Sequence, residues 1–133
     1  MEVSIILGSE NDRDFAQNGV KVLENANVEY EIVVHSAHRD LDGLLKYLNE
    51  MKGVKIIIAV AGMSAALPGI VASHVKIPVI GVPRDIGTFH GIDALLSMIQ
   101  MPKGVPLATM GIGKAGMINA AKLALRILEV IGK

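Results

Sequence analysis

The residue types best suited to chemistry in this chain lie close together, at Ser36, His38 and Arg39. A histidine can accept and donate protons near neutral pH, and the planar guanidinium of an arginine can bind a phosphate or a carboxylate. A serine at such a position can also cap a following helix. Because the three groups fall on one short segment, we expect a ligand site here, with His38 as the proton-transfer group. A capping serine beside two structural or solvated side chains is the alternative.

The flanking residues place this cluster on a loop between a strand and a helix. Residues 29–34 alternate and are rich in β-branched side chains, whereas residues 41–48 carry apolar side chains at helical spacing. In open α/β sheets such loops lie at the carboxyl edge of the strands, where ligands bind and helix N-termini present free N–H groups to anions. The pattern therefore indicates that Ser36, His38 and Arg39 face a ligand.

A second candidate loop contains Gly8, Ser9 and Asp12 and follows a predicted strand at residues 3–7. A glycine permits close approach of the backbone, and a serine hydroxyl and helix N–H groups can bind phosphate oxygens. A carboxylate can accept hydrogen bonds from ribose hydroxyls. The loop thus suits a phosphorylated sugar, although Ser9 or Asp12 as an ordinary helix cap is the simpler alternative. The helix that follows is expected to reach about Asn25.

A third loop, from Ala61 to Gly69, consists mostly of small residues and includes Gly62 and Leu67. It follows an almost continuous apolar run at residues 54–60, which is typical of a central parallel strand covered on both faces. Small residues let the backbone approach a planar ligand or a neighbouring subunit closely. Tight packing of a helix on the sheet explains the same composition.

The rest of the chain completes an alternating pattern. Strands are expected at residues 77–83 and 105–110, and helices at residues 91–101 and from about 111 to 131. Five strands alternating with helices predict one α/β domain, residues 1–133, with a parallel sheet covered on both faces. The glycines that open the last helix match neither the Walker spacing nor the dinucleotide pattern, so dinucleotide binding is not indicated.

Composition excludes several function classes. The chain has 13 Lys and Arg residues and 13 Asp and Glu residues, so no basic surplus favours nucleic acid or an anionic membrane. Hydrophobic residues make up 51% and aromatic residues 3%, which predicts that some apolar surface forms subunit contacts. The absence of cysteine excludes disulfides and thiolate chemistry. Because we find no signal segment and no apolar run long enough for a bilayer, we expect a cytoplasmic protein.

The remaining histidines are His35, His74 and His90. They are isolated in the sequence and have no metal-ligand spacing, so we interpret them as structural or surface groups. His90 is the one best placed for a role, because it falls on a late loop between a strand and a helix.

Four segments become specific when they are taken together in this order and spacing. They are Gly8-Ser9-Glu10-Asn11-Asp12, Ser36-Ala37-His38-Arg39, residues 61–69, and Gln100-Met101-Pro102 with the residues that follow to Thr109. With these segments the chain resembles the N5-carboxyaminoimidazole ribonucleotide mutase family of purine biosynthesis and its relative, aminoimidazole ribonucleotide carboxylase. The similarity covers essentially the whole chain.

The resemblance implies a flavodoxin-like three-layer sandwich with a five-stranded parallel sheet, assembled into a homo-octamer with active sites at subunit contacts. It implies transfer of a carboxyl group from the exocyclic nitrogen of a ribonucleotide to ring carbon 4, without a metal or an organic cofactor. His38 would be the proton shuttle. The residues implied to bind substrate are Ser9, Asp12 and Arg39 on the ribose phosphate, Ser36 as a helper, and Gly8, Ala61, Gly62 and Leu67 along the pocket.

One position departs from the mutase pattern. A histidine normally precedes the Leu-Pro-Gly motif, and this chain has Ala66 there. The carboxylase branch also lacks that histidine but usually has an asparagine in the loop, which is absent here too. Direct carboxylation of aminoimidazole ribonucleotide by carbon dioxide and a non-catalytic nucleotide-binding protein therefore remain alternatives to the mutase. A phosphoacceptor domain is disfavoured, because no aspartate closes the strand that ends at Val60.

Overall fold

The protein is built on a sheet of five parallel strands, and the computed structural model describes residues 1–132. The strands are β1 (Val3–Leu7), β2 (Tyr30–Val34), β3 (Ile56–Ala61), β4 (Val79–Pro83) and β5 (Ala108–Thr109). Their order in the sheet is β2-β1-β3-β4-β5, and every pair is parallel. This is the flavodoxin-like order of a doubly wound sheet, so the predicted fold class is confirmed.

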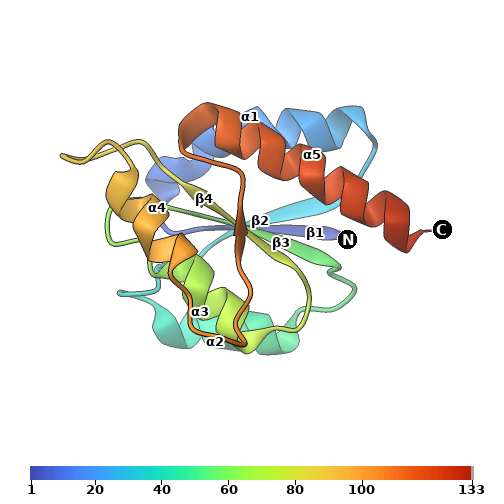
Figure 1. Ribbon diagram of the computed structural model, residues 1–133. Coiled ribbons are helices and arrows are strands. Elements are labelled where there is room, and N and C mark those ends of the chain that lie inside the picture. The colour runs from blue at the N-terminus through green and yellow to red at the C-terminus, as the bar shows by residue number, and fades with distance from the viewer. Residues whose placement is uncertain (133) are drawn as a thin grey trace.

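Helices cover both faces of the sheet. They are α1 (Arg13–Asn25), α2 (Leu41–Glu50), α3 (Leu67–His74), α4 (Ile92–Ile99) and α5 (Gly113–Ile131), with a short 3₁₀ helix, η1 (Glu10–Asp12), before α1. Figure 1 shows α1 and α5 on one side of the sheet and α2, α3 and α4 on the other. None of the helices in the described residues is long and apolar enough to cross a membrane.

Successive side chains of the central strands enter two separate cores. On β1, Val3, Ile5 and Leu7 pack with the side chains of α1 and α5, while Ile6 packs in the core beneath α2, α3 and α4. Because side chains alternate along a strand, a strand buried on both faces must be apolar at almost every position. Both β1 and β3 are buried along their whole length.

The strand register brings the candidate loops to one edge of the sheet. Leu7 at the end of β1 lies opposite Val34 at the end of β2, and it also lies opposite Val60 near the end of β3. Ala61 lies opposite Pro83 at the end of β4. The segments that follow these four strands therefore leave the sheet side by side.

Two element boundaries differ from the sequence expectation. The segment expected to be a loop as far as Gly69 is already helical from Leu67, because α3 begins there with Pro68 in its first turn. Proline is well tolerated in that turn, where its missing N–H has no helical partner to lose. The last strand was expected over residues 105–110, but only Ala108 and Thr109 pair with β4. Pro106 lacks the N–H that a longer ladder would need.

Candidate active site

A pocket of about 300 Å³ opens at the carboxyl edge of the sheet. It brings together all nine residues predicted for the site, which are Gly8, Ser9, Asp12, Ser36, His38, Arg39, Ala61, Gly62 and Leu67. These residues come from the segments that follow β1 and β2, and from the stretch between the last residue of β3 and the first residue of α3. Their convergence in one pocket is what the edge of a doubly wound sheet allows, and the role of each residue stays a prediction.

The loop after β1 is held in shape by a reciprocal pair of hydrogen bonds. The Ser9 hydroxyl oxygen accepts from the Asn11 N–H at 3.1 Å, and the Ser9 N–H donates to Asp12 Oδ2 at 3.1 Å. These residues form a capping box, so the simpler interpretation of Ser9 and Asp12 as caps also holds. Since the Ser9 oxygen acts as an acceptor here, its O–H remains able to donate to a ligand.

Arg84 is a pocket residue that the sequence analysis missed. Its Nη1 donates to Asp12 Oδ1 at 2.7 Å, and its guanidinium carbon lies 4.4 Å from the centre of the Phe15 ring. The Asp12 side chain is only 6% exposed and that of Arg84 17%, so each charge compensates the other away from water. The available signal was positional, because Arg84 is the first polar residue after β4 and therefore lies at the ligand-binding edge.

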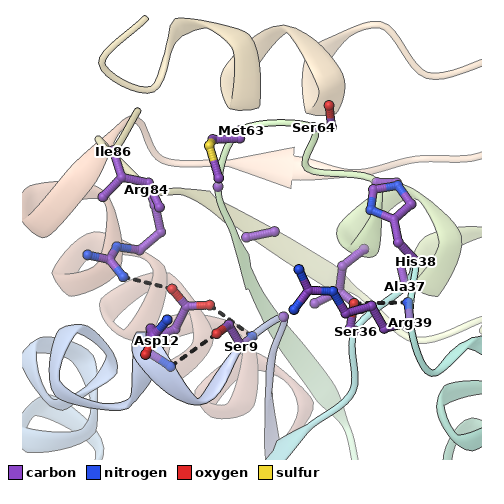
Figure 2. A pocket seen from close by; sticks show the side chains of 16 residues that line it. Ser9, Asp12, Ser36, Ala37, His38, Arg39, Met63, Ser64, Arg84 and Ile86 are labelled. Carbon is purple, nitrogen blue, oxygen red and sulfur yellow. Dashed lines mark hydrogen bonds and ion pairs between the residues drawn. The ribbon is translucent and has the colours of Figure 1, made fainter. Parts of the chain in front are cut away.

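The loop after β2 carries the remaining polar groups. The Ser36 hydroxyl accepts from the Arg39 N–H at 3.2 Å, whereas the residue that caps α2 is Asp40. The expectation that Ser36 could cap this helix is therefore wrong, because the helix starts later and Ser36 stabilises the loop instead. In Figure 2 the Arg39 side chain extends into the pocket between Ser9 and His38. His38 lies at the end of the pocket opposite Arg84.

The segment after β3 forms the wall between these two ends. A Cβ atom on Gly62 would lie 2.7 Å from Ile86 Cδ1 and 3.2 Å from Arg84 Cβ, so a glycine is needed for this close approach. Ala66 also lines the pocket, so the position that departs from the mutase pattern faces the site. The pocket residues not predicted from sequence are Asn11, Ala37, Met63, Ser64, Ala66, Arg84 and Ile86.

The other histidines lie outside this pocket. His90 lines a second cavity of about 480 Å³ beside α4, together with Phe89, Ile92 and Leu96. Within one chain His90 therefore lies in a different cavity from His38. Over residues 1–132 no group of three or more His, Cys, Asp or Glu side chains is arranged to hold a metal ion.

The charges in the pocket favour an anionic ligand. Asp12 is the one acidic side chain among the described residues that line it, and that carboxylate is paired with Arg84. Arg39 consequently adds positive charge on the side of the pocket where the Ser9 hydroxyl lies, and both groups are donors that suit phosphate. Fold and pocket together define an α/β protein with a pocket that suits a small anionic molecule next to a histidine.

Enzymes of one family are similar to this chain over nearly its whole length. The AIR carboxylase family model matches residues 2–132. The N5-carboxyaminoimidazole ribonucleotide mutase of Saccharolobus solfataricus is 46% identical over 131 residues, which are 97% of this chain and 82% of that protein. The Bacillus subtilis enzyme of the same name is 47% identical over 129 residues, which are 96% of this chain and 80% of that protein.

A solved structure agrees with this assignment. The crystal structure of Treponema denticola PurE superposes with a TM-score of 0.84 at 32% sequence identity, covering 96% of this chain and 80% of that one. The chain therefore belongs to the AIR carboxylase family.

Proposed function

We infer that this protein is an N5-carboxyaminoimidazole ribonucleotide mutase, an isomerase of purine biosynthesis. It moves a carboxyl group from the exocyclic nitrogen of the ribonucleotide to ring carbon 4. The observation that carries this inference is the identity of 41–47% with several mutases from bacteria and archaea across 95–98% of the chain. The pocket adds a second line of support, because its residues suit the parts of this substrate.

The substrate phosphate and ribose fit the end of the pocket near the first loop. Ser9 has a free O–H and Arg39 extends toward it, so we place the phosphate there. Each carboxylate oxygen of Asp12 accepts one hydrogen bond, Oδ2 from the Ser9 N–H and Oδ1 from Arg84. Its other lone pairs can still accept hydrogen bonds from ribose hydroxyls. Gly8, Ser36, Ala61, Gly62 and Leu67 complete the wall.

His38 is the group to which we assign the proton transfers. When the carbamate C–N bond breaks, carbon dioxide forms and the exocyclic nitrogen takes a proton from the His38 imidazolium. Ring carbon 4 then attacks carbon dioxide, forming the new C–C bond, and its proton passes to the now neutral imidazole. The histidine ends the cycle as it began, so one residue can serve both steps. Confinement of carbon dioxide beside the electron-rich ring supplies much of the rate.

Ala66 is the observation that favours a second candidate function. The alanine lines the pocket and offers no titratable group there, where the mutase pattern has a histidine. A direct carboxylase, a carboxy-lyase in the reverse direction, would use aminoimidazole ribonucleotide and carbon dioxide in the same pocket. The two candidates differ only in which substrate turns over.

We further propose that the protein acts in the cytoplasm as a homo-octamer. The surface of α4 supports assembly, because Ile92, Leu96 and Ile99 are 57%, 45% and 54% exposed. Phe89, in the segment just before α4, is 63% exposed. Such an apolar face is costly in water and is typical of a subunit contact. Light scattering of the purified protein should give eight times the chain mass, and a monomeric mass would overturn the proposed assembly.

A spectrophotometric assay tests the proposed function. The purified protein is given the carbamate ribonucleotide in one reaction, and aminoimidazole ribonucleotide with bicarbonate in another. Turnover of the carbamate supports the mutase, and turnover of the second mixture alone would reassign the protein to the carboxylase branch. No reaction with either substrate, while the ribonucleotide still binds, would indicate a non-catalytic binding protein.

A further inference from the structure

The loop of residues 36–39, which carries His38 and Arg39, is bracketed by two residues whose side chains touch. His35 Nδ1 lies 2.8 Å from Asp40 Oδ2, so the residue before the loop is joined to the residue after it. Neither residue lines the pocket. This contact therefore acts on the loop from outside the substrate site.

Asp40 connects its side of the loop to helix α2. Its Oδ1 accepts a hydrogen bond from the Gly43 N–H at 3.2 Å, which makes it the N-cap residue. A Cβ atom on Gly43 would lie only 2.4 Å from that Oδ1, so the glycine leaves room for the carboxylate. One carboxyl group thus binds the first turn of α2 and His35 at the same time.

His35 connects the other side of the loop to the sheet. Its backbone N–H donates to the Leu7 carbonyl at 3.0 Å, which continues the pairing of β2 with β1. Its ring lies 5.6 Å, centre to centre, from the ring of Tyr47 on α2. The Tyr47 hydroxyl in turn donates to Glu31 of β2 and is in hydrogen-bond contact with Ser4 of β1. Burial raises the pKa of Tyr47, which keeps its proton available for Glu31.

We propose that His35 and Asp40 form a positioning clamp, which holds the span of loop 36–39 so that His38 and Arg39 face the substrate. The inference rests on the proposed function, because it assigns a role to the loop that carries the proton shuttle. An exposed ion pair adds little to global stability, and the Asp40 side chain is 50% exposed. The effect of the clamp is therefore expected in the geometry of the loop. The hydrogen bond from His35 also lowers the pKa of Asp40, because it stabilises the ionised carboxylate.

Three substitutions distinguish the hydrogen bond between His35 and Asp40 from the other contacts of these two residues. His35→Phe keeps a ring against Tyr47 but removes the hydrogen bond to Asp40. His35→Asn places an amide near the position of Nδ1 and can restore that bond. Asp40→Ser keeps a good N-cap for α2, while its side chain is too short to reach His35.

We expect His35→Phe and Asp40→Ser to lower kcat by about tenfold and to raise KM for the carbamate severalfold, because both His38 and Arg39 would move. His35→Asn should recover most of the loss. The double variant His35→Phe with Asp40→Ser should be no worse than the poorer single variant, since both remove the same contact. His74→Asn is the matched control, because this exposed histidine has its ring nitrogen in hydrogen-bond contact with Ser73 and Ile70 of its own helix, away from the pocket.

Hydrogen exchange provides a readout that does not depend on turnover. The amides of residues 36–40 should exchange faster in His35→Phe and Asp40→Ser, while those of β3 stay near the values of the unaltered protein and the thermal midpoint falls only slightly. Unchanged exchange, unchanged kcat and KM, or strictly additive losses in the double variant would each overturn the clamp. If the unaltered protein turned over neither substrate, the proposed function would fail, and the exchange measurement would still decide whether the clamp exists.

Discussion

The Arg84 guanidinium lies 2.7 Å from the Asp12 carboxylate and joins the segment after β4 to the segment after β1. The pair is largely buried, with side-chain exposures of 17% and 6%. Asp12 is also held by the Ser9 N–H at 3.1 Å, so its orientation in the pocket is fixed from two directions. Arg84 therefore helps to fix the orientation of the Asp12 carboxylate in the pocket.

Replacement of Arg84 by methionine should destabilise the protein by roughly 3 kcal/mol, because it leaves a buried carboxylate without its cation. Methionine keeps an apolar stem against Phe15, so the loss reflects charge and hydrogen bonding more than packing. KM for the ribonucleotide should also rise as Asp12 becomes free to turn. Urea unfolding and steady-state kinetics measure the two effects.

Arg13→Met is the matched control for this prediction. Arg13 pairs with Glu10 on the exposed surface of η1 and α1, and such a pair contributes little to stability. The control should unfold at the same urea concentration as the unaltered protein. If Arg84→Met also unfolded at the urea concentration of the unaltered protein, the Asp12–Arg84 pair would contribute nothing to stability.

The contact between Asp40 and His35 should make stability depend on pH in acid. The hydrogen bond from His35 lowers the folded-state pKa of Asp40 below its ordinary value. A carboxyl group with a lowered folded pKa stabilises the fold above its unfolded pKa, and this contribution disappears as pH falls through the folded pKa. The difference in thermal midpoint between the unaltered protein and Asp40→Ser should therefore be largest near neutral pH. It should shrink below about pH 4, and a difference that grew in acid would contradict the assignment.

Ala66→His tests whether the absent histidine marks a lost activity. In an active mutase the added imidazole should leave turnover nearly unchanged or reduce it, because Ala66 already lines a working pocket. Ala66→Val adds bulk without a titratable group and so separates crowding from chemistry. A large gain of carbamate turnover in Ala66→His alone would support the non-catalytic interpretation of the unaltered protein.

The sequence was informative where local pattern and position suffice. A short apolar run located β1, and an alternating pattern rich in β-branched residues located β2. The rule that ligands bind at the carboxyl edge predicted that Ser9, His38 and Gly62 meet in one pocket. The start of α3 was missed because Pro68 and Gly69 usually interrupt helices, and this helix has no polar face among its first residues.

Contacts between particular side chains were beyond the reach of these patterns. Arg84 belongs to no sequence motif. Its place in the pocket is recognised from its ion pair with Asp12, which lies 72 residues earlier in the chain. His35 was read as a structural or surface group, and only the fold shows that it touches Asp40. The first contact arises because the loops of a parallel sheet meet in space although they are far apart in sequence, whereas the second is a local contact across the loop between β2 and α2.

The most direct measurement is carbamate turnover by the unaltered protein and by His38→Asn, with ribonucleotide affinity determined for both by calorimetry. If His38 carries the proton transfers, the variant should lose at least about a hundredfold in kcat, because general acid and base assistance is removed. Its affinity for the ribonucleotide should change little, since Ser9, Asp12 and Arg39 remain in place. A His38→Asn variant that turned over the carbamate as fast as the unaltered protein would contradict the account.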